Sequence, residues 1–430
     1  PCFATTVYAQ QEVENSFSFS GQLRPRLELR AGAFKPLQDG EQPAILVSDR
    51  LRLQLNYAYK DVLEIKIVPQ AVSVWGQSAM VQKPETSGSQ LSVFEAYTKL
   101  KMSDYWHIQL GRQAISLDDE RFYGALDWAQ GARAFDGLQF DFKNDKLQWK
   151  NYFVYNQNYK TLYGNNINNP TGNLYNPQDA YPFKWMQTMW GSVKIDKHSN
   201  LSALVSNLGF QNELPATVKG TTNWLQTFGM HYTYQSQKIS TTGSAYLQTG
   251  KNLNAVNTTA YLLAVSAGTF VTNHLSVSLG SDFLSGNKLG STTNHNKAFN
   301  PFFGTNHKFY GSMDYFYAGS DHKNTGLSDS YIKLNWSPSK KTTCNFTVHQ
   351  FFSPTKIVDA NEKYASNLGQ EADLGVNVQL NKMASLQGGY SFYITNPTIN
   401  YLKNTPNGKS CQQWFWMSLN ITPKFFETKY

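Results

Sequence analysis

The stretch GQLRPRLELRAG (Gly21–Gly32) decides the fold, because charged and apolar residues alternate in it. Its two sets occupy opposite parities: Arg24, Arg26, Glu28 and Arg30 against Leu23, Leu27 and Leu29. A helix with a period of 3.6 residues cannot separate these sets, but a strand points successive side chains to opposite faces. The stretch therefore predicts a β-strand with an apolar environment on one side and a polar environment on the other.

The composition allows that strand to lie in a membrane. Charged residues make up 16% of the chain, against roughly 25% in soluble domains. The most apolar window, residues 260–271, is interrupted by Ser266, Gly268 and Thr269 and is shorter than the roughly 18 apolar residues of a spanning helix. A spanning strand needs only about 10 alternating residues. The sequence thus excludes a helical membrane protein and leaves a β-barrel open.

The charge balance and the cysteines exclude other classes. The net charge is +8 and the pI is about 9.1, but the basic residues are spread at alternating positions and form no runs, which argues against nucleic-acid binding. The three cysteines, Cys2, Cys344 and Cys411, are far apart and lack metal-binding or redox spacing. We expect no cofactor, no metal and no structural disulfide.

The first residues look like the end of an export signal. Val7 and Ala9 fit the positions before a cleavage site, and a polar segment follows from Gln10. We therefore expect a signal remnant at 1–9, a periplasmic segment at 10–16 and a barrel at 17–430.

The alternation recurs along the whole chain, and short and long connections separate the alternating segments in turn. Short turns are expected at 60–61, 103–104, 144–145, 196–199, 236–237, 272–273, 337–340 and 381–383. Long connections are expected at 32–46, 76–91, 114–133, 158–185, 210–223, 251–256, 286–326, 352–369 and 396–412. This arrangement is typical of an outer-membrane barrel with tight periplasmic turns and long external loops. It predicts eighteen strands, with residues 308–317 assigned to the seventh long connection because an extra strand would break the parity.

Aromatic residues support this register. They fall at the expected periplasmic strand ends, on the apolar face: Phe17, Phe19, Tyr57, Tyr59, Trp106, Tyr232, Tyr234 and Trp336. Aromatic rings favour the level of the lipid headgroups. A soluble β-sandwich or propeller would also alternate, but the short and long connections and the lack of a repeated blade motif favour the barrel. The predicted fold class is all-β: one transmembrane antiparallel barrel in the outer membrane of a Gram-negative bacterium.

The same alternation assigns charged residues to the lumen. The basic set is Arg24, Arg26, Arg30, Arg50, Arg52 and Lys66, with Lys99, Lys101, Lys150 and Lys333 further along. The acidic set is Glu28, Glu64, Glu95, Asp141, Glu371 and Asp373. Rings of arginine and lysine select anions, whereas charges that pair across strands only keep the lumen polar. The surplus of arginine on the first two strands favours an electropositive constriction.

The stretch GRQAISLDDERFYGALDWAQGARAFDG (Gly111–Gly137) holds a cluster of charges. Its adjacent carboxylates, Asp118, Asp119 and Glu120, are types used in acid–base catalysis or calcium binding, but no spacing here matches a calcium loop. We expect instead that ion pairs hold this loop folded into the lumen, where it narrows the pore. The residues expected to do so are Asp118, Glu120, Arg121, Asp127 and Arg133.

This stretch resembles the alginate export porin family, and residues 298–316 and 368–380 resemble it as well. The matching positions are Arg112, Asp119, Glu120, Arg121, Asp127, Trp128, Arg133 and Asp136. The resemblance implies an eighteen-stranded outer-membrane barrel with an arginine-rich lumen, which in the best-known members passes a polyanionic polysaccharide outward. It also implies that these residues line or narrow the pore. The alginate exporter closes its inner mouth with a long periplasmic turn near the C-terminus, but the turn at 381–383 is too short for that.

The leading expectation is a channel for passive passage of small anionic or saccharide solutes, narrowed by the loops at 114–133 and 286–326. The tyrosines and asparagines of 155–183 would suit sugar binding. The alternatives are a dedicated exporter of an acidic polysaccharide and a structural barrel in a larger membrane complex. An enzyme is not expected, since His107, His231 and His349 lie on distant strands with no recognisable nucleophile. The expected partners are the lipid bilayer with lipopolysaccharide and the solutes.

Overall fold

The computed structural model of the 430-residue chain describes residues 14–76, 89–156, 183–211, 222–290, 294–318, 320–359 and 362–430. These residues form mostly strands, with one short helix, α1 (Pro397–Leu402), and one 3-10 turn (Asn306–Lys308). Within the described ranges, no helix has the length and apolar character needed to cross a membrane. The predicted signal remnant at 1–9 lies outside the described residues.

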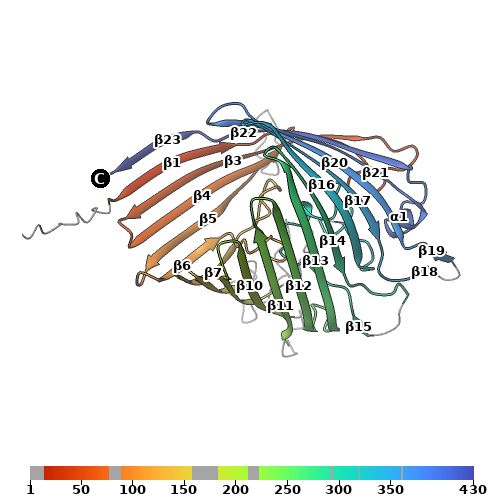
Figure 1. Ribbon diagram of the computed structural model, residues 1–430, viewed down its shortest axis with the longest axis horizontal. Coiled ribbons are helices and arrows are strands. Elements are labelled where there is room, and N and C mark those ends of the chain that lie inside the picture. Colours follow the sequence, from red (N-terminus) through yellow and green to blue (C-terminus); the bar gives the residue numbers. More distant parts are fainter. Residues whose placement is uncertain are drawn as a thin grey trace, which may run out of the picture.

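Eighteen antiparallel strands close into one barrel in the described part of the chain, which confirms the predicted fold class (Figure 1). The first strand is β1 (Ser16–Leu23) with β2 (Arg26–Ala31), and the last is β22 (Cys411–Ile421) with β23 (Lys424–Lys429). Those between are β3 (Ala44–Tyr59), β4 (Leu63–Val74), β5 (Ser89–Lys101), β6 (Trp106–Gln113), β7 (Phe135–Lys143), β8 (Leu147–Tyr155), β9 (Trp185–Lys194), β10 (Ser199–Gln211), β11 (Thr222–Gln235), β12 (Ile239–Lys251), β13 (Asn257–Thr272), β14 (Leu275–Leu284), β16 (Leu327–Ser339), β17 (Thr342–Phe352), β20 (Asn367–Gln379) and β21 (Ala384–Ile394). Three short pieces lie in the connections: β15 (His295–Asn296), β18 (Ile357–Asp359) and β19 (Glu362–Tyr364).

The barrel closes where the first strand pairs with the last. β1 pairs with β23, and β2 pairs with β22. Both strands are interrupted at a proline, Pro25 and Pro423, which has no N–H to give to the ladder. Because the barrel is closed, the backbone N–H and C=O groups of the first and last strands hydrogen-bond to each other. Lipid hydrocarbon offers them no hydrogen-bond partner.

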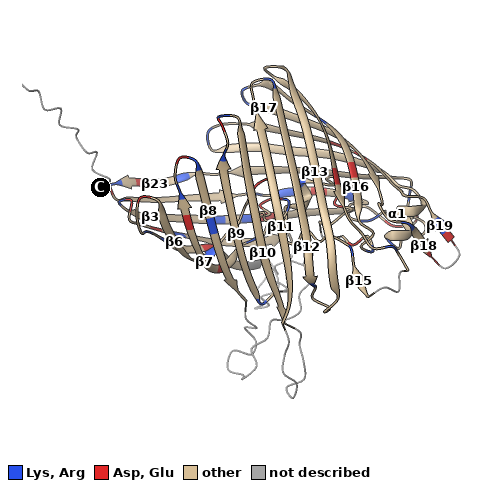
Figure 2. Ribbon diagram, turned by 60° about the horizontal axis from the view of Figure 1, so that its bottom comes forward, with Lys and Arg blue, Asp and Glu red and all other residues tan. Residues whose placement is uncertain are grey.

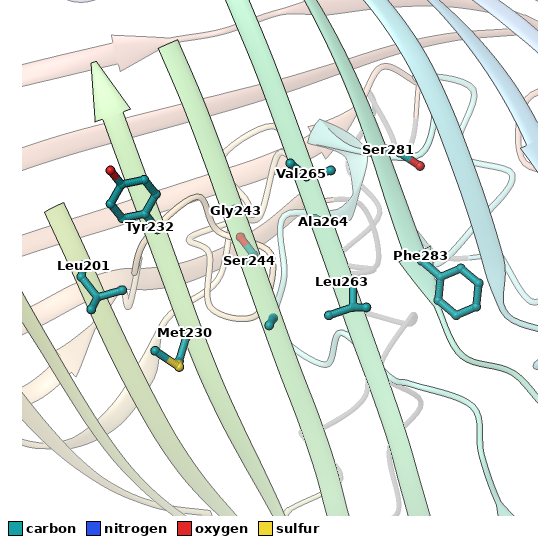
Figure 3. A pocket seen from close by; sticks show the side chains of 11 residues that line it. Leu201, Met230, Tyr232, Gly243, Ser244, Leu263, Ala264, Val265, Ser281 and Phe283 are labelled. Atoms are coloured by element: carbon teal, nitrogen blue, oxygen red, sulfur yellow. The ribbon is translucent and has the colours of Figure 1, made fainter. Parts of the chain in front are cut away.

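Side-chain exposure confirms the alternation of the wall. On β3, Leu51 and Leu53 are 45% and 37% exposed on the outside, whereas Arg50 and Arg52 are 0% and 9% exposed on the inside. The outward face of β10–β14 is largely apolar where it is hollowed. A hollow of about 530 Å³ on the outside of β10–β14 is lined by residues that include Gly243 and Met230 (Figure 3).

The connections follow the predicted order of short turns and long segments. The seventh long connection runs from 285 to 326 and includes residues 308–317, which form no barrel strand. The parity argument is therefore confirmed at this point. Several predicted connections fall partly outside the described residues, including the tyrosine- and asparagine-rich segment 155–183, of which 157–182 are not described.

The buried apolar core lies inside the barrel and is built largely by two connections. We call residues 114–134 the inner loop and residues 285–326 the large loop. Phe303 of the large loop stacks on Tyr123 of the inner loop, with ring centroids 5.4 Å apart. Tyr315 stacks on Tyr393 of β21 at 4.2 Å. Both loops therefore pack on each other and on the inward-facing side chains of the wall.

Candidate functional site

The tip of the inner loop lies against the wall formed by the first two strands. The Asp127 carboxylate is shared by three arginines of that wall. Arg52 Nη1 and Arg50 Nη1 lie 2.9 Å and 3.0 Å from Asp127 Oδ1, and Arg24 Nη1 lies 3.6 Å from Asp127 Oδ2. The Asp127 side chain is still 55% exposed, whereas that of Arg50 is fully buried. One carboxylate that faces the lumen thus neutralises part of a cluster of three cations.

Arg24 and the neighbouring Arg26 also bind the backbone of the loop tip. Arg24 Nη1 donates to the Asp127 carbonyl at 2.8 Å, and Arg26 Nη1 donates to the Trp128 carbonyl at 2.9 Å. Gln70 on β4 donates to the Gly131 carbonyl at 2.9 Å. Hydrogen bonds from charged donors are stronger than neutral ones, so the arginines act as a latch on the loop. We call Arg24, Arg50, Arg52 and Asp127 the arginine latch.

The charge state of Asp127 follows from these contacts. Removal from bulk water raises the pKa of Asp127, but the charge and hydrogen bond of Arg50 and the charges of Arg52 and Arg24 together outweigh it, so this pKa lies below its ordinary value. The carboxylate is therefore ionised throughout the neutral and mildly acidic range.

This pKa predicts how the latch responds to acid. Because the folded pKa is depressed, the contribution of Asp127 to holding the loop is fully present above the unfolded value of about 3.9 and is lost as the pH falls through the lower folded value. We expect the same single-channel conductance at about pH 7 and pH 5, and a higher, noisier conductance near pH 3. An unchanged trace at the acidic end would contradict the latch.

Beside the latch, Glu28 binds two further arginines. Glu28 Oε1 lies 3.0 Å from Arg26 Nε, and Glu28 Oε2 lies 2.8 Å from Arg30 Nη2. The Arg26 guanidinium also covers one face of the Trp128 ring at 4.4 Å, while His307 of the large loop stacks on Trp128 at 4.3 Å. The first two strands thus present five arginines, and the carboxylates that contact them are Asp127 and Glu28.

The first half of the inner loop is held by the opposite wall. Arg121 Nη1 lies 2.6 Å from Asp282 of β14, and Arg121 Nε lies 2.8 Å from Asp119. Asp118 accepts hydrogen bonds from Trp190 of β9 and Ser202 of β10. Since the two halves of the loop contact opposite sides of the barrel, the loop crosses the lumen.

The inner loop also contacts the large loop. Arg133 donates to the carbonyls of Phe303 and Gly304, and Lys308 Nζ lies 3.7 Å from Glu120 Oε2. Four non-glycine residues of the inner loop take left-handed backbone conformations: Asp118, Glu120, Leu126 and Ala132. Such conformations cost roughly 1–2 kcal/mol per residue, and they persist because the surrounding contacts determine the path of the loop.

The remaining predicted residues lie elsewhere on the inner wall. Glu371 Oε1 accepts from Met313 N at 2.7 Å, and Asp373 Oδ2 accepts from Ser312 N at 3.3 Å. These two residues of β20 therefore hold a turn of the large loop. Lys66 and Glu95 pair at 2.5 Å across β4 and β5, and Glu95 Oε1 accepts from Ala114 N, at the start of the inner loop, at 3.3 Å.

Comparisons with known proteins agree with this architecture. The sequence pattern of the family described as alginate export matches residues 76–395. The chain belongs to the alginate export family. The resemblance inferred from the motif at 111–137 is thereby confirmed. No curated protein sequence matched the chain.

Solved structures similar to this member of the alginate export family are outer-membrane porins. OccAB1 of Acinetobacter baumannii has a TM-score of 0.63 at 12% identity, over 95% of this chain and 97% of that one. OccAB4 of the same species has a TM-score of 0.65 at 11% identity, over 96% and 99%. The outer membrane protein OprD of Pseudomonas aeruginosa has a TM-score of 0.61 at 11% identity, over 97% and 96%. At these identities the likeness concerns the fold, which is that of an outer-membrane porin of Gram-negative bacteria.

Two motif residues of the alginate export family were predicted to line the pore, and the structure corrects this prediction. Arg112 and Asp136 form a two-contact ion pair between β6 and β7, with Nη2 and Oδ2 2.6 Å apart. Gln109 and Gln113 hydrogen-bond to each other on the inner side of β6, so Arg112, next to Gln113, points outward with Leu110, which is 62% exposed. The family motif implied that these two residues line the lumen. The alternation along β6 and β7 places both on the outer face.

No metal centre is seen in the described ranges, where no group of three or more histidine, cysteine, aspartate or glutamate side chains is suited to an ion. His349 lies between two carboxylates of the wall, 2.9 Å from Asp329 and 3.7 Å from Asp373. His231 donates to or accepts from Ser244 at 2.8 Å. His349 and His231 therefore behave as polar residues of the inner wall that contact neighbouring wall side chains.

The sequence analysis missed other residues of this member of the alginate export family. Asp282 holds Arg121, Trp414 donates to Glu28, and His307 covers Trp128. Lys403 donates to the Tyr315 and Asp321 carbonyls and to Ser320 Oγ, and so ties the last long connection to the large loop. The only available signal was the density of aromatic residues in 298–317, which is unusual for a loop exposed to water.

Proposed function

We propose that this chain forms an outer-membrane channel for the passive passage of small solutes, with a preference for anionic or saccharide molecules. The observation that carries the proposal is the surplus of arginine at the loop tip, where Arg24, Arg50 and Arg52 contact the single carboxylate of Asp127. Arginine-rich walls in a narrow pore favour anions.

The uneven distribution of charge supports the same proposal. Charged residues are rare on β9–β13, where they occur only at strand ends, while the first two strands carry five arginines (Figure 2). A hollow of about 510 Å³ next to the latch is lined mainly by hydroxyl, amide and charged side chains, including Ser20, Gln54, Asn56 and Lys66. Such a lining suits a hydroxylated solute that carries a negative charge.

Membership in the alginate export family favours a second candidate, the dedicated export of an acidic polysaccharide. A polymer would need a continuous cationic track, and the arginine latch would form one part of it. The latch is closed by the loop's own carboxylate, so a polymer would have to compete with Asp127. A structural role in a larger membrane complex is the third candidate, and it requires a lumen that does not conduct.

Single-channel recording in planar bilayers tests these candidates. The reversal potential is measured under a KCl gradient, and a polyuronate oligomer is then added to one side. Anion selectivity without block supports the channel for small solutes, and anion selectivity with discrete block supports export of an acidic polysaccharide. A non-selective current contradicts the arginine-based proposal, and the absence of current favours the structural role.

Arg30 provides a direct probe of selectivity, because it is on the wall but makes no contact with Asp127. Its side chain is 29% exposed and pairs with Glu28. One unit charge about 10 Å from a passing ion is worth about 0.4 kcal/mol in water. We therefore expect Arg30→Gln to lower the anion-to-cation permeability ratio about fourfold, a factor of about two from each ion, with little change in conductance. An unchanged reversal potential would mean that ions pass along another wall.

A further inference from the structure

The outward face of β9, β10 and β11 carries three rows of side chains near the ends that lead to long connections. From the end inward, the first row is Gln211 and Thr222, joined by Lys184, which precedes β9 and reaches Gln211 with its ammonium group. The second row is Trp185, Gly209 and Trp224, and the third is Gln187, Asn207 and Gln226. Trp185 and Trp224 are 40% and 37% exposed on the outside, whereas their neighbours Met186 and Leu225 are buried inside. We call these nine residues the three-row surface.

The innermost row is unusual for a surface that faces lipid. Asn207 Nδ2 donates to Gln187 Oε1 at 3.0 Å, and Gln226 Nε2 donates to Asn207 Oδ1 at 2.8 Å. These bonds use two of the six N–H groups of three side-chain amides. Hydrocarbon cannot satisfy further donors and acceptors, so such a row calls for a polar partner that itself lies at the edge of the membrane.

The middle row lies at the level of an aromatic girdle. The Trp224 ring lies so close over Gly209 that a Cβ there would fall 2.9 Å from it. Trp185 packs on Tyr155 of β8 at 4.5 Å. Tryptophan and tyrosine gather at the headgroup level. The amide row, two residues deeper along each tilted strand, therefore lies about 5 Å below that level.

The rows on either side have opposite character. The Lys184 ammonium lies outside the tryptophans, where it contacts Gln211 Oε1 and lies 6.0 Å from the Tyr155 ring centroid. Below the amide row, Val205 pairs with Met189 and Phe228, two side chains that are 45% and 44% exposed. From outside to inside, the surface thus offers a cation, two indoles, an amide ladder and apolar side chains.

We propose that the three-row surface is a binding site for a phosphorylated glycolipid with amide-linked acyl chains, the chemistry of lipid A. The phosphate lies at Lys184, the sugar lies at Trp185 and Trp224, the acyl amides bond to the ladder at Asn207, and the chains cover Met189 and Phe228. Each group of such a lipid meets its chemical counterpart at the matching depth. The inference rests on the proposed function as an outer-membrane channel, with the long connections on the external side as expected from the sequence.

Native mass spectrometry of the full-length protein in detergent tests the site, with lipid A, dephosphorylated lipid A and phosphatidylglycerol as probes. The variant is Asn207→Leu, which removes the centre of the ladder and makes the surface more apolar. The control is Thr259→Leu, the same kind of exchange on the outward, exposed side of β13 near its external end. We expect Asn207→Leu to weaken lipid A binding about five- to tenfold and the control to leave it unchanged. Dephosphorylated lipid A should bind less tightly than lipid A.

Three results would overturn the proposal. They are equal binding of lipid A by Asn207→Leu and the parent protein, equal binding of phosphatidylglycerol and lipid A, and a dimer that Asn207→Leu dissociates, which would make the ladder a contact between two copies. Ion conductance of Asn207→Leu is recorded in parallel and should stay unchanged. A protein that binds lipid A at this site but does not conduct would leave the lipid site standing and reject the proposed channel.

Discussion

We expect Arg50→Gln to increase the population of the open state of the inner loop more than any other single substitution in the wall. The Arg50 guanidinium is fully buried and binds the Asp127 carboxylate at 3.0 Å, along with carbonyls of the loop tip. Removing one partner of such a pair leaves the other groups without their donor, at a cost of about 2–4 kcal/mol. The open state of the inner loop would then be populated roughly 30- to 900-fold more often.

The measurement is single-channel conductance, where we expect frequent excursions to a higher level and weaker anion selectivity. Arg112→Gln is the matched control, because Arg112 pairs with Asp136 on the outer face and has no contact with the latch. If Arg50→Gln and Arg112→Gln gave the same trace as the parent protein, the latch would not control the pore.

Phe303→Ala is expected to cause the largest loss of packing inside the barrel. Phe303 is fully buried and contacts the rings of Tyr123, Phe135 and Phe183, with centroids 5.3–5.4 Å apart. Truncating a buried phenylalanine costs about 3–5 kcal/mol. The strands do not depend on this ring, since their ladder is closed without it. We therefore expect an intact barrel in which both loops are loosened.

Limited proteolysis in detergent micelles should show this as faster cleavage within the loops, while the folded barrel keeps its gel mobility without boiling. Phe346→Ala serves as the control, because Phe346 lies on the outward face of β17 and is 39% exposed. Unchanged cleavage in Phe303→Ala would mean that the loops are held by polar contacts alone, with the arginine latch as the main one.

The response to ionic strength separates the two forces that hold the inner loop in the parent protein. The latch at Asp127 is electrostatic and should weaken at high salt through its exposed carboxylate, although less than a fully exposed ion pair would. The aromatic contact between Tyr123 and Phe303 is apolar and should not. Comparing conductance at low and high ionic strength in the parent protein therefore indicates which force limits loop opening.

The sequence by itself determined the wall. Alternation with period two at residues such as Arg50–Leu53 assigned the faces correctly, because a strand has only two sides and a closed barrel gives each side one solvent. The order of short and long connections determined the number of strands, because each connection is followed by a strand that crosses the membrane again.

Only the tertiary structure decided what fills the lumen. That Asp127 meets Arg24, Arg50 and Arg52, and that Arg121 meets Asp282, depends on where a loop of 21 residues (114–134) crosses the barrel. No periodicity fixes such a path, because loop conformation is set by contacts between segments far apart in the chain. Arg112 and Asp136 are a different case: Arg112 has the parity of Trp106, so the alternation alone places it on the outer face, and only the family motif implied the lumen.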